Sequence, residues 1–206
     1  MRKIRSFVGC WLLSSLCLTD GVGQETMHYP QDAADIIAFS EIFSRLDFSV
    51  NDAIKRLGTV YSAERNDFRI ALSPFPSEKD RIRGVMVASF DETQEGRNKL
   101  DYVEIDYLKP VLISYGEIMK KYGPPGYIPP PVAKCPPHAV NCPPRFVGYR
   151  FSFVPDTKSL TSGKSREVTI NLEMEWSKEL PQHTDKDFLA VKAIRFKRFW
   201  REFWRD

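Results

Sequence analysis

The feature that most constrains the fold is a strict two-residue alternation between residues 167 and 176. In a β-strand successive side chains point to opposite faces of the sheet. The alternation therefore predicts a strand with one buried face and one polar face. The apolar set is Val168, Ile170, Leu172, Met174 and Trp176, and the polar set is Glu167, Thr169, Asn171, Glu173 and Glu175.

Weaker signals of the same kind predict five further strands. They lie at residues 68–72, 85–90, 103–107, 147–153 and 188–196. Clusters of Gly, Pro and charged residues separate them, which is typical of strands that turn back on one another. We therefore expect an antiparallel sheet.

Two helices are predicted before the first strand. Asp32 can cap the first helix, whose apolar side chains are Ile36, Ile37, Phe43 and Leu46. Ser49 and Asp52 have the spacing of a capping box at the start of the second, and Gly58 follows its last residue. The residues before Asp32 read as a polar lead-in.

A third helix is expected to start at Pro110, because proline is accepted in a first helical turn, and to end at Gly123. Its ending, Lys120–Gly123, resembles Lys55–Gly58, and about three predicted strands follow each helix. We expect an α+β fold with helices packed on one face of the sheet. A tandem α-βββ repeat, with halves 32–108 and 109–206, is one form of this fold.

The segment Ser49–Thr59, followed by strands, resembles the helix-to-strand motif of the SmpA/OmlA outer-membrane assembly lipoproteins and the related β-lactamase inhibitor protein. The direct match covers about 11 residues, and the order of elements extends it over the chain. The resemblance implies a tandem helix-plus-sheet scaffold that binds protein through its sheet face. It carries over no catalytic residue.

The first 23 residues have the order of a secretory signal. A basic start is followed by the mostly apolar stretch 7–18 and by small residues before Gln24. The apolar stretch is shorter than the roughly 20 residues that a membrane-spanning helix needs. We expect cleavage before Gln24 and a periplasmic or secreted α+β domain, 24–206. Neither Cys10 nor Cys17 has the sequence context of a lipid attachment site.

The exported part of the chain is nearly neutral. Segment 1–23 holds three of the 30 basic residues and one of the 27 acidic residues, so its removal lowers the net charge from +3 to +1. A neutral domain has no overall field that attracts nucleic acid. Nucleic acid is therefore not expected as a partner.

Two cysteines, Cys135 and Cys142, remain after cleavage and lie in the Pro-rich segment 124–144. Two neighbouring cysteines in an exported chain predict one disulfide that closes a short loop. The alternatives are a metal site that adds His138 and a redox-active pair. The metal site lacks a fourth ligand, and the pair lacks Cys-x-x-Cys spacing.

No catalytic, cofactor or metal motif is found in the sequence. The three histidines, His28, His138 and His183, have no second ligand at metal-binding spacing. Three acidic residues lie in or just before the predicted strand 103–107. We expect them to form a solvated face of this strand, and the alternative is that two of them form a catalytic carboxylate pair. The three residues are Asp101, Glu104 and Asp106.

Aromatic residues recur at helical spacing between residues 196 and 204, with basic residues between them. We expect the strand 188–196 to continue into an amphipathic helix that contacts a protein or an anionic membrane surface. The alternative is that these aromatics cover one edge of the core. The candidate partner-binding residues are Phe199, Trp200, Arg201, Phe203 and Trp204.

Together these features predict a non-enzymatic envelope protein that binds another envelope or extracellular protein, through its sheet face or its aromatic C-terminus. The alternatives are a small hydrolase or lyase with its site in the sheet concavity, and a binder of anionic membrane surfaces. A polar concavity that gathers Asp106, Glu173, Glu175 or a histidine would favour the enzyme.

Overall fold

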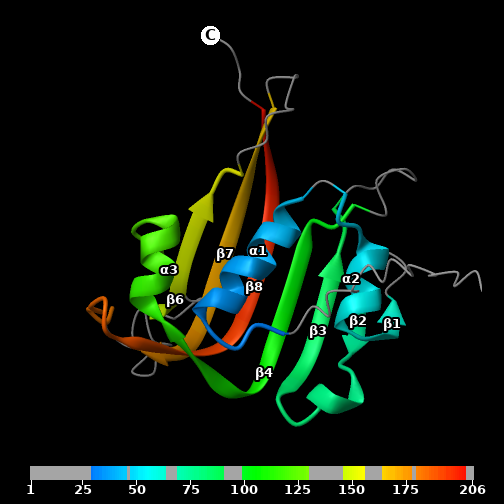
Figure 1. Cartoon of the computed structure of the whole chain (residues 1–206), viewed down its shortest axis with the longest axis horizontal. Helices are drawn as coiled ribbons and strands as arrows, with labels where there is room; N and C mark the ends of the chain where they lie inside the picture. Colours follow the sequence, from blue (N-terminus) through cyan, green and yellow to red (C-terminus); the bar gives the residue numbers. More distant parts are fainter. Residues whose placement is uncertain are drawn as a thin grey trace, which may run out of the picture.

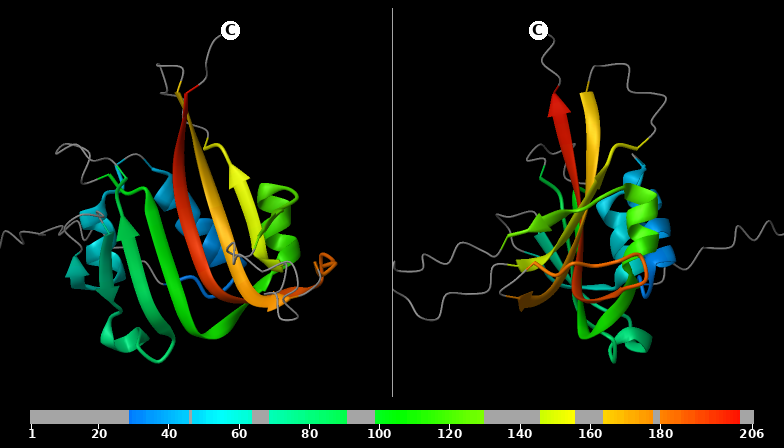
Figure 2. Two further views of the ribbon diagram at one scale, coloured as in Figure 1. Left: turned by 180° about the vertical axis from the view of Figure 1, so that it is seen from behind. Right: turned by 90° about the vertical axis from the view of Figure 1, so that its left-hand side faces the viewer.

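In the part of the chain that the structure describes, three α-helices lie on one face of an eight-stranded antiparallel sheet (Figure 1). The computed structural model describes residues 29–45, 47–63, 69–90, 99–129, 146–155, 164–177 and 180–202. The side view in Figure 2 places all three helices on the same side of the strands. The predicted α+β class, with an antiparallel sheet covered on one face, is confirmed.

The two predicted N-terminal helices form with the predicted caps. Helix α1 spans Ala33–Ser44, and the Asp32 side chain accepts a hydrogen bond from the backbone N–H of Asp35. Helix α2 spans Val50–Leu57, and both hydrogen bonds of the Ser49–Asp52 capping box are present. Gly58 ends α2 with a positive φ of 149°, a conformation that favours glycine.

The third helix starts five residues later than predicted. Helix α3 spans Tyr115–Tyr122, with Ser114 as its N-cap, and the preceding residues extend strand β4 instead. Pro110 lies where the pairing of β4 with β8 is interrupted between Asp106 and Val111. A proline is tolerated in such an irregularity because no ladder hydrogen bond is lost there. The prediction that the helix starts at Pro110 was therefore wrong.

The strands follow the order β1-β2-β3-β4-β8-β7-β6-β5 across the sheet. Strands β1 to β4 form one meander, β5 to β8 form another, and the antiparallel pair β4–β8 joins them. A short 3-10 helix, Pro76–Glu78, precedes β3. The strands are β1 Thr59–Ala63, β2 Arg69–Ser73, β3 Ile82–Ala88, β4 Tyr102–Ser114, β5 Gly126–Ile128, β6 Phe146–Phe153, β7 Lys164–Ser177 and β8 Phe188–Glu202.

Each meander therefore has four strands rather than the expected three. Strands β1 and β5 were not predicted, and they are the two edges of the sheet. Both are short, and the side chains of Val60, Tyr61 and Tyr127 on them are exposed, so neither carries a buried alternation that sequence patterning could detect. The repeat itself, with halves 32–108 and 109–206, stays a prediction.

The predicted C-terminal amphipathic helix is wrong for the residues described. Strand β8 continues through Phe196 to Glu202, and its pairing with β7 is unbroken from Lys164↔Glu202 to Glu173↔Ala193. Phe196 is fully buried beneath the helices, whereas Phe199 lies on the opposite face with 39% of its surface exposed. Tertiary pairing with β7 thus overrides the helical spacing of the aromatics.

The hydrophobic core fills the space between the helices and the sheet. The rings of Phe39 on α1 and Phe196 on β8 stack with centroids 4.4 Å apart. Tyr29, expected in a polar lead-in, is instead buried with only 2% of its surface exposed. Its hydroxyl donates to the backbone carbonyl oxygen of Leu57, and burial raises its pKa to about 12.

Helix α1 ends without a glycine, and two buried arginines satisfy its last carbonyl groups. Arg166 on β7 and Arg198 on β8 are 0% and 4% exposed, and each donates to the carbonyl oxygens of Phe43 and Arg45. Burial lowers the pKa of Arg198 to about 10. Both cations complement the negative end of the helix dipole.

Candidate binding site on the helix-free sheet face

The sheet face opposite the helices carries a row of paired residues that crosses the eight described strands, and its members on β4, β8, β7 and β6 are charged or polar. The register pairs link its members one after another from β1 to β5. None of the described helices packs on this side of the sheet (Figure 2). We call this side of the sheet the helix-free face. From β1 to β5, the row consists of Ser62, Ala71, Met86, Glu104, Arg195, Asn171, Arg150 and Gly126.

An ion-pair network occupies the middle of this row and spans the junction of the two meanders. Arg195 on β8 is 2.7 Å from Glu104 on β4 and also pairs with Glu173 on β7. Tyr102 donates a hydrogen bond of 2.5 Å to the other Glu104 oxygen. Burial lowers the pKa of Arg195, but its bonds to the two carboxylates raise it further, so the net shift is upward.

Asp106 lies beside this network but is not part of it. Its carboxylate has no hydrogen bond or ion pair with any residue in the described ranges. Burial raises its pKa, and the negative charges of Glu104 and Glu173 add to the effect. The positive charges of Arg195 and Arg83 lower it, without reversing the shift.

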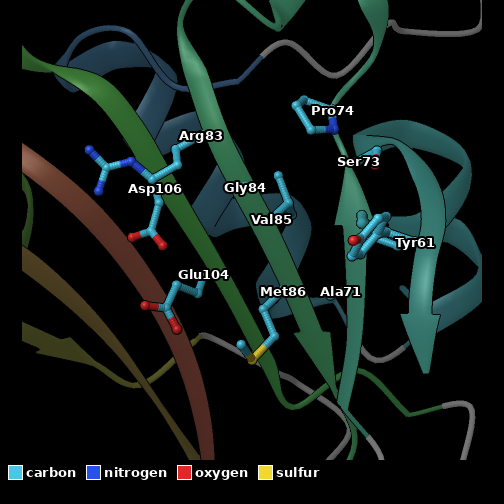
Figure 3. A pocket seen from close by; sticks show the side chains of 11 residues that line it. Tyr61, Ala71, Ser73, Pro74, Arg83, Gly84, Val85, Met86, Glu104 and Asp106 are labelled. Carbon is cyan, nitrogen blue, oxygen red and sulfur yellow. The ribbon is translucent and has the colours of Figure 1, made fainter. Parts of the chain in front are cut away.

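A pocket of about 420 Å³ lies next to Asp106 on the same face. Tyr61 from β1 forms one wall and Glu104 and Asp106 from β4 form the other (Figure 3). Strands β2 and β3 form the floor between the walls, with the small residues Ala71 and Gly84. The volume falls in the range of roughly 300–1,000 Å³ that is common for ligand sites.

The acidic residues predicted on a solvated strand face have two different environments. Glu104 and Asp106 do lie on the helix-free face, where they line the pocket. Asp101 is buried with 5% of its surface exposed, and it accepts a hydrogen bond from the backbone N–H of Phe90. It lies before β4 begins, so the strand alternation does not extend to it.

Most of the other sequence-predicted site residues lie outside the described ranges. Cys135, Cys142, His28, His138, Phe203 and Trp204 belong to this group, as does the signal segment 1–23. Trp200 and Arg201 lie in β8, and their side chains are not described. The disulfide and the cleavage site therefore stay predictions.

His183 packs between aromatic rings and away from the pocket. Its ring centroid is 5.6 Å from that of Tyr115 and 5.5 Å from that of Tyr149. Within the described ranges, no group of three or more His, Cys, Asp or Glu side chains is arranged to hold a metal ion. Glu175, another residue singled out for a catalytic concavity, pairs with Lys192 instead.

The register, and not any sequence motif, brings the site together. Tyr61, Gly84, Asp106 and Arg195 come from four strands that are distant in the sequence.

No family model, curated protein or solved structure matches this chain in the comparisons made. In the described parts of the chain, no helix is long and apolar enough to cross a membrane. The resemblance to the SmpA/OmlA lipoproteins stays a prediction.

Proposed function

We propose that this chain is an exported, non-enzymatic protein that binds another protein through the helix-free face of its sheet. The observation that carries this proposal is the contrast between the two faces. One face is covered by α1, α2 and α3, and the other presents the charged and polar side chains of the row and a pocket that shares some of the row's residues. A broad surface with an adjoining pocket is typical of a recognition surface.

The charge pattern of the face suits a protein partner. Glu104, Arg195 and Glu173 hold one another in fixed positions, and fixed charges contribute more to specificity than mobile ones. The exposed aromatic residues Tyr61 on β1 and Phe199 on β8 also lie on this face. Aromatic groups beside ordered charges are common in protein interfaces.

The two alternatives have less support. An enzyme needs an acid or base together with a second reacting group. Asp106 in the pocket is a candidate acid or base, but the pocket lining contains no histidine or cysteine to act with it, and Arg195 and Tyr102 already engage Glu104. The membrane-surface hypothesis relies on an amphipathic helix that residues 196–202 do not form. A protein partner therefore accounts best for the exposed face.

Position-dependent photo-crosslinking tests the proposal. A photo-crosslinking amino acid at Ser152 or Ser73 reports on the helix-free face at each half of the sheet, and the same residue at Lys55 or Lys120 reports on exposed positions of α2 and α3. In host cells, one partner of defined mass should be captured from the two serine positions and not from the two lysine positions. Capture from the helices alone would contradict the proposal.

A further inference from the structure

We propose that the pocket above Gly84 accepts a lysine or arginine side chain of the protein partner, with Asp106 as its counter-ion. This inference rests on the proposed function and names the chemistry that the partner presents. It follows from three features of the pocket: a glycine that the fold does not need, an amphipathic lining, and a carboxylate that has no hydrogen bond or ion pair with the residues described.

Gly84 lies inside β3, where neither its backbone nor its surroundings require glycine. Its φ is not positive, and an added Cβ atom would meet nothing within 4 Å. By contrast, a Cβ atom on Gly148 would lie 1.9 Å from the backbone oxygen of Leu172, so that glycine is needed for packing. A strand-interior glycine costs about 0.5–1 kcal/mol relative to alanine, and it often marks a place where a ligand approaches the backbone.

The missing side chain of Gly84 leaves the pocket open beside Asp106. Gly84 is paired directly with Asp106 in the register of β3 and β4. The side chains of paired residues lie next to each other on one face of the sheet. Glycine here therefore removes the group that would otherwise pack against the Asp106 carboxylate.

The lining matches a long cationic side chain. Lysine and arginine have an apolar stem and a charged end, and they bury the stem along apolar groups. Tyr61 on one wall and Met86 on the floor offer such groups, and Asp106 and Glu104 form the wall opposite Tyr61 (Figure 3). A cation near Tyr61 can also interact with the face of its ring.

The local charges favour a cation over an anion. Arg195 is shared between Glu104 and Glu173, so it is not available to pair with Asp106. The charge of Arg83 on β3 also acts on Asp106, but within the described residues Arg83 forms no ion pair with that carboxylate. Three carboxylates thus face two guanidinium groups, and one further positive charge would balance the group. The upward pKa shift of Asp106 agrees with this deficit.

A short peptide with a single lysine is the probe. Acetyl-Gly-Gly-Lys-Gly-Gly-amide is titrated into the full-length chain and compared with the same peptide containing norleucine or arginine, using amide NMR shifts. The lysine and arginine peptides should bind at least about 10-fold more tightly than the norleucine peptide, since a hydrogen bond to a charged group contributes about 1.5–3 kcal/mol. Equal binding of the norleucine peptide would show an apolar pocket and overturn the inference.

Three variants and one control define the site. Gly84→Leu should fill the pocket and abolish binding, and Asp106→Asn should weaken it about 10-fold. Arg83→Gln should tighten it about 2- to 5-fold, because a competing positive charge is lost. Ala190→Leu introduces the same side chain at an exposed position of β8 and should change nothing. If Gly84→Leu does not fold, the opposite effects of Asp106→Asn and Arg83→Gln decide the question.

The remaining outcomes separate this inference from the proposed function. Failure of every peptide to bind would overturn the cation pocket, while the crosslinks from Ser152 and Ser73 would still support the binding face. Shift changes that grow with protein concentration without peptide, and that disappear in Gly84→Leu, would identify a second copy of the chain as the occupant. That result would overturn the assignment to a partner's cationic side chain.

Discussion

The guanidinium group of Arg198 lies 5.0 Å from the ring centroid of Phe43 and donates a hydrogen bond to the backbone carbonyl oxygen of the same residue. One side chain thus joins the central strand β8 to the end of α1. Arg166 reaches the same carbonyl oxygen from β7 at 3.2 Å. These two arginines connect the end of α1 to β7 and β8.

We predict that Arg198→Met lowers the free energy of unfolding by about 1–3 kcal/mol. Methionine keeps most of the apolar volume but cannot donate, so the carbonyl oxygens of Phe43 and Arg45 keep only their bonds from Arg166. The loss of hydrogen bonds from a charged donor costs about this much. Arg198→Ala, which also leaves a cavity, should cost more. Urea unfolding of the two variants, with Lys55→Met on the surface of α2 as control, measures both effects. An Arg198→Met variant as stable as the parent would show that β8 does not hold α1 through this contact.

Asp106 should make stability depend on pH in a specific direction. Its pKa is raised in the folded protein, so the folded state holds the proton more tightly than the unfolded chain does. Stability from this group is present below the unfolded value of 3.8 and is lost as pH rises through the folded pKa. Glu104, Glu173, Arg195 and Arg83 are the charged groups that face it.

Asp106→Asn should therefore raise the melting temperature at pH 7 and have little effect at pH 3.5. The difference should grow between these limits, since only the ionised carboxylate is unfavourable in the folded state. Differential scanning fluorimetry at several pH values tests this, with Asp80→Asn in the turn before β3 as control. A melting temperature at pH 7 that falls in Asp106→Asn would contradict the prediction.

Tyr29 should be needed for folding although it comes before the first helix. Its ring is in the core and its hydroxyl bonds to the backbone of α2. Tyr29→Ala should cost about 3–5 kcal/mol, the range for loss of a buried aromatic ring. Tyr29→Phe should cost about 1 kcal/mol through the lost hydrogen bond. Chemical unfolding of the pair separates the contributions, and equal stability of both variants and the parent would exclude a core role.

The predicted Cys135–Cys142 disulfide should have a local effect. A short loop contributes only about 2–3 kcal/mol by the chain-entropy estimate, and the sheet and its core form from other residues. Reduction should lower the melting temperature slightly and leave the far-ultraviolet circular dichroism spectrum unchanged. Alkylation followed by intact-mass measurement reports whether the purified protein contains the bond, and two alkylated thiols without prior reduction would exclude it.

The sequence predicted elements whose signals are local. The Ser49–Asp52 capping box and the alternation along β7 depend on neighbouring residues, and both form as expected. The edge strands β1 and β5 were missed because an exposed strand needs no apolar alternation. Helical spacing after Phe196 was misleading because pairing with β7 decided the conformation.

The site was harder to predict because it depends on register between distant strands. Glu104 and Arg195 are 91 residues apart, and only the β4–β8 pairing brings them together. Gly84 carries no signal by itself, since a glycine before a run of apolar residues also fits a turn. Its meaning comes from Asp106 on the next strand and from the empty space above it.

The place of β8 in the sheet has a consequence for how the protein is made. β8 is the last of the eight strands along the chain, yet it lies between β4 and β7 in the middle of the sheet. While the chain is released from the ribosome or the export machinery, the edges of β4 and β7 that pair with β8 in the final sheet remain unpaired until β8 is also released. Unpaired edges are sites of aggregation, so a chaperone that shields them should matter most for this protein just before synthesis or translocation reaches Phe188.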